Sequence, residues 1–243
     1  MMKRYLLLLT TLLFSFSAFS MTITAAQDPW PPFVNKGKGD AGISVEIVSE
    51  ALASQGHQVQ FKIMPWTRAL NEVKNGKVDI LVATWFTDER TSFLKYSDSY
   101  LENSLKFIKR AGDGFEYNDY NSLNGKSVGI IRNYGYGTEF LNATNFKKPE
   151  ANDLIANVKK LKAKRIDLTL EDELVAKATI SGAGMNLADF DFTNNALSVN
   201  PIHVTSGLAN PKHAEIIDAF NKGLAEIKAN GTFDKILMKY GIK

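Results

Sequence analysis

The chain has 243 residues, of which 44% are hydrophobic, with no cysteine and a formal net charge of +3. Charges this close to balance argue against a protein dedicated to nucleic acid or to membrane surfaces. Without disulfide bridges the fold must depend on its hydrophobic core, and a chain of this length can bury a sufficient one.

The first twenty residues have the pattern of a secretory signal peptide. Lys3 and Arg4 form a short positive stretch, an apolar run covers residues 5–19, and small residues stand where a signal peptidase reads the chain. An uncleaved membrane anchor is the alternative, but a run of about 15 residues is shorter than the roughly 20 that span a membrane. We expect cleavage after Ser20 and a mature chain, from Met21, with 27 basic and 26 acidic residues. With no cysteine to carry a lipid anchor, the expected location is free in the periplasm.

Short apolar strands then alternate with amphipathic helices. The pattern predicts strands at residues 22–26, 59–63 and 80–83, a helix from residue 43 that ends at Gly56, and a helix at residues 67–75. Strands that are continuously apolar indicate a parallel sheet covered by helices on both faces.

The same alternation restarts after Ser122. It predicts strands at residues 128–131, 166–170 and 202–205, and helices at residues 135–141, 153–163, 172–180, 212–229 and 233–240. Two α/β units in one chain indicate two small lobes with a cleft between them. Ligands of open α/β sheets bind at the carboxyl ends of the strands, so functional residues are expected directly after strands.

Four places after predicted strands carry aromatic and charged residues. They are Asp-Pro-Trp-Pro-Pro-Phe at 28–33, Met-Pro-Trp-Thr-Arg at 64–68, Thr-Trp-Phe-Thr-Asp-Glu-Arg at 84–90, and the pair of segments 132–138 and 171–173.

At these places the sequence resembles the solute-binding proteins of amino-acid-type ABC importers, the type II periplasmic binding proteins of bacterial extracellular family 3. The resemblance covers essentially the whole mature chain. It is carried, in order, by Trp-Pro-Pro-Phe at 30–33, residues 42–52, Asn-Gly-Lys-Val-Asp-Ile at 75–80, Thr-Asp-Glu-Arg at 87–90, Ser-Asp-Ser-Tyr at 97–100, Leu-Asn-Gly-Lys-Ser-Val-Gly at 123–129 and Gly-Thr-Phe-Asp-Lys-Ile at 231–236.

The resemblance implies a two-lobed α/β clamp that closes at a hinge around a small polar solute. Lobe 1 is expected to comprise residues 21–103 plus 201–243 and lobe 2 residues 104–200, with two crossovers near residues 100–104 and 197–201. The implied function is capture of an amino acid or related carboxylate for an ABC permease in the inner membrane. A monomer without catalytic residues, cofactor, metal or nucleic-acid partner is expected.

The resemblance also implies roles for charged residues of the cleft. Arg90 falls where the family holds the ligand's α-carboxylate, a task that suits a planar guanidinium and not a lysine; the alternative is a surface arginine. Asp172 falls where the family places an acid for the α-ammonium, and the alternative is a helix N-cap. Glu173 is more simply a solvated acid in the first turn of a helix.

Aromatic and backbone groups complete the implied site. Trp30 and Trp66 match positions whose rings sandwich the ligand, and core packing is the competing use of a tryptophan. The backbone amides of Gly135 and Tyr136 would form an anion-binding helix start, unless they belong to an ordinary turn.

Departures from the family pattern leave the identity of the ligand open. Thr84 is included in the expected site, and Trp85 follows it where the family often has serine or threonine. Gln27 replaces an acid that members taking cationic amino acids often carry, which weakens a lysine or arginine ligand. Arg68 and Arg132 are expected near the cleft, where they would suit an additional anionic group; surface ion pairs are the alternative.

Two other functions remain open from the sequence. A periplasmic dehydratase of the same fold would use Arg68, Arg90 and Arg132 to hold a cyclic dicarboxylate and Asp172 or Glu173 as general acid. A sensory domain would need a membrane segment or a separate partner. The three histidines have no metal-ligand spacing.

Overall fold

The structure is a computed structural model that describes residues 20–36 and 39–242. Apart from Ser20, the predicted signal peptide lies outside the described residues. The elements of the first half are β1 (Thr22–Gln27), α1 (Ile43–Ser54), β2 (Gln58–Ile63), α2 (Trp66–Lys74), β3 (Ile80–Trp85), η1 (Glu89–Ser92) and β4 (Leu94–Arg110). Those of the second half are η2 (Tyr120–Leu123), β5 (Val128–Ile131), α3 (Thr138–Asn142), β6 (Glu150–Ala151), α4 (Leu154–Lys162), β7 (Leu168–Asp172), α5 (Glu173–Gly182), η3 (Leu187–Asp189), β8 (Phe190–Gly207), α6 (His213–Ala229) and α7 (Thr232–Lys239).

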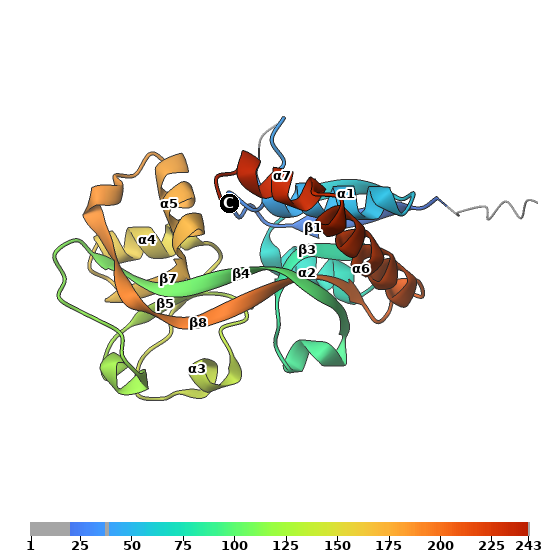
Figure 1. Cartoon of the computed structure of the whole chain (residues 1–243). Helices are drawn as coiled ribbons and strands as arrows, with labels where there is room; N and C mark the ends of the chain where they lie inside the picture. Colours follow the sequence, from blue (N-terminus) through green and yellow to red (C-terminus); the bar gives the residue numbers. More distant parts are fainter. Residues whose placement is uncertain (1–19, 37–38, 243) are drawn as a thin grey trace, which may run out of the picture.

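One eight-stranded sheet runs through the molecule in the order β2-β1-β3-β8-β4-β7-β5-β6. Figure 1 shows two lobes joined by β4 and β8, with α1, α2, α6 and α7 on one lobe and α3, α4 and α5 on the other. The parallel pairing expected from the strands at residues 22–26, 59–63 and 80–83 is present in β1, β2 and β3, but it does not extend across the whole sheet. It is parallel near both ends, but β3–β8, β4–β8 and β4–β7 are antiparallel.

The connection between the lobes is a pair of long antiparallel strands. β4 has 17 residues and β8 has 18, and each passes from one lobe into the other. The residues predicted as crossovers lie inside these strands, where Glu102 pairs with Pro201 and Asn103 with Asn200. Register shifts interrupt the ladder on either side, between Ser99 and Leu101 and between Leu105 and Lys106. Bulges of this kind bend and twist paired strands, so this segment is suited to act as a hinge; the lobe boundaries themselves stay a prediction.

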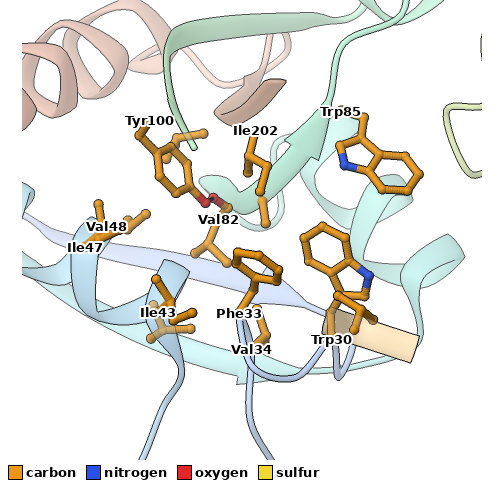
Figure 2. Packing of buried hydrophobic residues seen from close by; sticks show 14 of the residues in the cluster. Trp30, Phe33, Val34, Ile43, Ile47, Val48, Val82, Trp85, Tyr100 and Ile202 are labelled. Carbon is orange, nitrogen blue, oxygen red and sulfur yellow. Dashed lines mark hydrogen bonds between the residues drawn. The ribbon is translucent and has the colours of Figure 1, made fainter. Parts of the chain in front are cut away.

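The main buried cluster of lobe 1 forms between α1, the loop after β1 and the sheet. Figure 2 shows this packing, with Ile43, Ile47 and Val48 of α1 facing Phe33, Val34, Val82, Tyr100 and Ile202. The Tyr100 hydroxyl donates a hydrogen bond to the carbonyl of Val82 at 2.7 Å. Trp30 and Trp85 lie side by side at one end of the cluster, with ring centroids 5.6 Å apart. The core of lobe 1 therefore continues directly into the aromatic residues of the cleft.

Helices α1 and α6 approach so closely that only a glycine fits at one position between them. A Cβ atom at Gly223 would lie 1.8 Å from the carbonyl oxygen of Ala51. That oxygen belongs to the backbone of α1, so it could move only if the helix moved. The contact makes Gly223 a sensitive test of the packing of lobe 1.

We predict that Gly223→Ala lowers the free energy of unfolding by about 1–3 kcal/mol, the usual cost of overpacking a core. Gly182→Ala is the matched control, because a Cβ there has no neighbour within 4 Å. As alanine favours helix, the control should be neutral or stabilising by up to about 1 kcal/mol. Urea denaturation of both variants measures the difference. Equal stability of the two variants would contradict the close approach of α1 and α6.

Candidate ligand-binding site

A small cavity lies between the two lobes at the carboxyl ends of β1, β3 and β5. Its volume is about 280 Å³, which includes space open to solvent. The lining residues are Gln27, Trp30, Trp66, Ala83, Trp85, Arg90, Tyr134 and Gly135. The strand ends thus bring together residues more than one hundred positions apart.

Arg90 is the cation of this cavity and is almost completely buried, at 5% exposure. It lies in the short 3₁₀ helix η1, directly after β3. Its Nη1 donates to the carbonyl of Trp85 at 2.9 Å and its Nη2 to the carbonyl of Asn133 at 2.6 Å. The guanidinium also stacks over the Trp66 ring, 5.2 Å from the centroid. Burial lowers the pKa of Arg90 from its ordinary value, but an arginine stays protonated in proteins, so the cavity keeps a positive charge.

Four aromatic side chains form the walls. Trp30 meets Trp85, Trp85 meets Tyr134, and Tyr134 meets Trp66, each pair edge to face with centroids 5.6–5.7 Å apart. The indole Nε1 of Trp85 donates to Oδ1 of Asn103 in β4 at 3.0 Å, which fixes this ring to the hinge strand. The walls therefore offer aromatic faces to a ligand. The Trp85 ring has little freedom to change its orientation.

Polar groups of lobe 2 reach directly across the cleft. The carbonyl of Asn133 accepts from Nε1 of Trp66 at 2.8 Å as well as from Arg90. The Tyr134 hydroxyl donates to Oδ2 of Asp28 at 3.0 Å. Asn133 has a φ of 62°, a left-handed conformation that asparagine tolerates better than most residues. Two neighbouring residues of one loop thus contact a cation and an acid of the opposite lobe.

Two acidic residues at the lobe interface were not among the expected site residues. Asp28 is half-buried and Glu171 is 1% exposed. Glu171 accepts hydrogen bonds from Nε1 of Trp30 at 3.2 Å and from the backbone amide of Asp172 at 2.9 Å. Burial raises the pKa of Asp28 to about 7 and that of Glu171 to about 8. Each lies beside an expected residue, but a single carboxylate forms no pattern by which sequence reasoning could find it.

Asp172 forms the N-cap of α5. Its Oδ1 accepts from the amides of Leu174 and Val175 at 2.9 and 3.2 Å, and its Oδ2 accepts from the amide of Ser104 at 3.1 Å. Burial raises its pKa above the ordinary value. The bonds from Leu174 and Val175 are those of a helix N-cap, and the bond from Ser104 ties the start of α5 to β4. A role toward a ligand ammonium stays a prediction.

The structure keeps two expected arginines away from the cavity. The Arg68 side chain is 69% exposed and lies 3.9 Å from Glu72. Arg132 is 53% exposed and pairs with Glu150 at 2.8 Å. Both contacts are the surface ion pairs that the sequence left as an alternative.

Of the other expected site residues, Gly135 lines the cavity, and Thr84 and Tyr136 are buried outside the lining. A Cβ at Gly135 would lie 2.9 Å from Cγ2 of Thr87 and 3.1 Å from Nη1 of Arg90, so a larger residue would crowd both side chains. The Thr84 hydroxyl forms a hydrogen bond with that of Thr205 at 3.0 Å, and the Tyr136 hydroxyl accepts one from the amide of Ile131 at 2.9 Å. Helix α3 begins later than expected, at Thr138, so Gly135 and Tyr136 precede it and do not form its first turn.

Gln27 lines the cavity and is held by the backbone of lobe 1, whereas Glu173 lies outside the lining. The Gln27 amide exchanges two hydrogen bonds with the backbone of Ala83, which ties β1 to β3. Glu173 forms ion pairs with Lys106 and Lys177.

Two negative findings hold for the part of the chain that the structure describes. None of its helices is both long and apolar enough to span a membrane. It also contains no cluster of three or more His, Cys, Asp or Glu side chains that could hold a metal ion.

Known proteins resemble the chain over nearly its whole length. Residues 22–243 match the family of bacterial extracellular solute-binding proteins, family 3. The arginine-binding extracellular protein ArtP of Bacillus subtilis is 23% identical and covers 98% of both chains. The lysine/arginine/ornithine-binding periplasmic protein of Escherichia coli is 25% identical over 96% of this chain and 92% of its own.

Among solved structures, a histidine kinase sensor domain with similarity to periplasmic binding proteins has a TM-score of 0.79 at 18% identity. The match covers 90% of this chain and 95% of that domain. The two-lobed α/β fold expected from the sequence is thereby confirmed.

We predict that the lobes close more readily at acidic pH. The pKa values of Asp28 and Glu171, about 7 and about 8 with the lobes in contact, fall toward ordinary values when water reaches the carboxyls. Protonation therefore stabilises the closed form fully at low pH, and this contribution is lost as the pH rises through both raised values. Small-angle scattering of the protein without added solute should give a smaller radius of gyration at about pH 5 than at about pH 9.

The Asp28→Asn, Glu171→Gln double variant is the control, because it keeps the shape of both acids without their titration. Its radius should not depend on pH over this range. The other titratable or charged groups near the two acids are Tyr134, Tyr136, Asp172 and, beside Tyr134, Arg90. A radius that is equal at both pH values in the unsubstituted protein would contradict the prediction.

Proposed function

The chain belongs to the bacterial extracellular solute-binding proteins of family 3, and from this premise we propose that it captures an amino acid or a related small carboxylate in the periplasm and delivers it to an ABC permease. The single observation that carries the proposal is the buried guanidinium of Arg90 in an aromatic cavity between two lobes. A guanidinium in such a cavity binds a carboxylate through paired, charge-assisted hydrogen bonds.

The geometry supports an exchange of the backbone carbonyl of Asn133 for a ligand carboxylate. That carbonyl accepts from both Arg90 and Trp66, and it belongs to the opposite lobe. A carboxylate between the same two donors would add a full negative charge to a buried positive one, a stronger interaction than a carbonyl dipole provides. Closure around the solute would then present one shape to the permease.

The relatives indicate which solutes to test first. The two reported relatives bind arginine, or lysine, arginine and ornithine, by their names. Both names also place those proteins outside the cytoplasm, in agreement with the signal peptide expected at residues 1–20. We propose a free, monomeric periplasmic protein with amino acids as the first candidates.

Catalysis is not part of the proposal. A dehydratase needs Arg68, Arg90 and Arg132 to converge on one dicarboxylate, but Arg68 and Arg132 form exposed ion pairs outside the cavity lining. Asp172 holds three backbone amides and Glu173 two lysines. The reported relatives are binding proteins and give the dehydratase no support.

We predict that Arg90→Ala weakens binding of the amino acid that binds best by about 30-fold or more, because it leaves a ligand carboxylate buried and unpaired. Arg68→Ala should change the affinity by less than about threefold, since an exposed ion pair contributes little. Isothermal titration with the twenty amino acids and a set of small organic acids measures both effects. Binding that is as tight in Arg90→Ala as in the unsubstituted protein would overturn the proposed carboxylate anchor.

A further inference from the structure

Asn103 lies in the middle of the hinge and is only half satisfied in its hydrogen bonds. It belongs to β4, pairs with Asn200 of β8, and lies between the two register shifts of the ladder. The residue is 1% exposed. Its Oδ1 accepts from Nε1 of Trp85 at 3.0 Å, but its Nδ2, although buried, has no hydrogen-bond partner among the residues that the structure describes. The hinge strand therefore contains a buried donor that is unpaired.

The indole of Trp85 determines how the amide of Asn103 is oriented. An indole N–H can only donate, so the carbonyl oxygen of Asn103 must face Trp85 and its Nδ2 must face away. Asn103 is also close enough to Asp172 to lower the pKa of that carboxyl, although the contact does not have the geometry of a hydrogen bond. The unpaired donor thus lies near a charged acceptor that it does not reach.

The Asp172 carboxylate has room for one more hydrogen bond. Its Oδ1 accepts from two amides of α5, and within the described part of the chain its Oδ2 accepts from the amide of Ser104 alone. An ionised carboxylate offers about four lone-pair positions. Ser104 directly follows Asn103 in β4, whereas Asp172 lies at the end of β7 in lobe 2. A small change at the hinge would therefore bring Nδ2 of Asn103 to a carboxylate that the next residue already contacts.

The unpaired donor makes the described arrangement of the hinge less favourable than one in which the donor is paired. Nδ2 of the facing Asn200 is likewise buried and unpaired within residues 20–36 and 39–242. A solute shifts the lobes only if its binding changes the relative free energy of two arrangements. Replacing the bond between Arg90 and Asn133, which joins the lobes across the cleft, would release one restraint on their positions. Pairing of Nδ2 would then favour the new arrangement.

We propose that Asn103 is a positioning residue that couples the cavity to the hinge: when a solute replaces the carbonyl of Asn133 at Arg90, the lobes shift and Nδ2 of Asn103 bonds to Asp172. One side chain then holds the Trp85 wall through its oxygen and lobe 2 through its nitrogen. The inference rests on the proposed function, because it takes a solute to bind at Arg90. It assigns Asn103 no contact with that solute.

The test is the pH dependence of solute binding to Asn103→Asp, measured by isothermal titration with the twenty amino acids and a set of small organic acids. The variant keeps an acceptor for Trp85. At neutral pH its carboxylate repels Asp172, whereas at acidic pH two neighbouring carboxyls share a proton and form the missing bond. Relative to the unsubstituted protein, the solute that binds best should bind about tenfold or more weakly at about pH 8, and within about threefold at about pH 5.

The ratio of the two affinities at each pH removes the titrations that both proteins share. Among them is that of Glu171, whose pKa responds to the charge of Asp172. Asn152→Asp is the matched control, because it makes the same substitution at an exposed position of lobe 2. Its affinity should stay within about threefold of the unsubstituted protein at both pH values, since an exposed charge contributes little.

Asn103→Leu keeps the test open if Asn103→Asp folds poorly. It removes both hydrogen-bonding groups and has no titratable group, so binding should weaken by about tenfold or more at both pH values. Binding within about threefold of the unsubstituted protein at both pH values would overturn the proposal.

The outcomes separate this inference from the proposed function. If a solute binds and Arg90→Ala abolishes that binding, but the affinity ratio of Asn103→Asp is the same at both pH values, the coupling is wrong and the solute-binding function stands. If no amino acid or organic acid binds, the proposed function fails and the inference fails with it. A ratio that depends on pH in Asn103→Asp and not in Asn152→Asp supports the coupling.

Discussion

The guanidinium of Arg90, held between two backbone carbonyls, is the interaction on which the cleft depends. One carbonyl, from Trp85, belongs to the same lobe, and the other, from Asn133, belongs to the opposite lobe. A buried cation is costly unless it is hydrogen-bonded. The second carbonyl is in reach only when the lobes meet, so satisfying Arg90 and closing the cleft are one event. The stacking of Arg90 on Trp66, which itself donates to Asn133, strengthens the same junction.

Sequence reasoning found the elements whose signal is local. β1, β3 and β5 are short segments rich in apolar residues, and their predicted bounds agree with the structure to within two residues. It predicted no strand over β4 and only residues 202–205 of β8, because the burial of both strands is irregular and β8 contains Pro201. These strands exist through their pairing with each other, about one hundred residues apart in sequence, and no local pattern reports such a partner.

The site was predictable where a residue directly follows a strand, and less so elsewhere. Trp30, Arg90 and Gly135 follow strands β1, β3 and β5, Trp85 is the last residue of β3, and all four line one cavity. Arg68 is only two residues from Trp66, but a helix turns about 100° per residue, so the two side chains leave α2 in nearly opposite directions. Proximity in sequence therefore predicted a shared site in strand-end turns and failed on the helix.

The contacts across the cleft lower the affinity for a solute and at the same time raise the selectivity between solutes. In the binding mode that we propose, a solute replaces the bond of Arg90 to Asn133, so only the difference between new and old contacts appears as binding free energy. A solute that lacks one of the matching groups breaks a bond without forming another, and leaves a buried polar group unpaired at a cost of about 1–3 kcal/mol. The net binding free energy of the correct solute is therefore modest, and that of a near analogue is much less favourable. Specificity is the difference between these two affinities. The carbonyl of Asn133 thus lowers the affinity for every solute that binds in this mode and lowers it most for the wrong one.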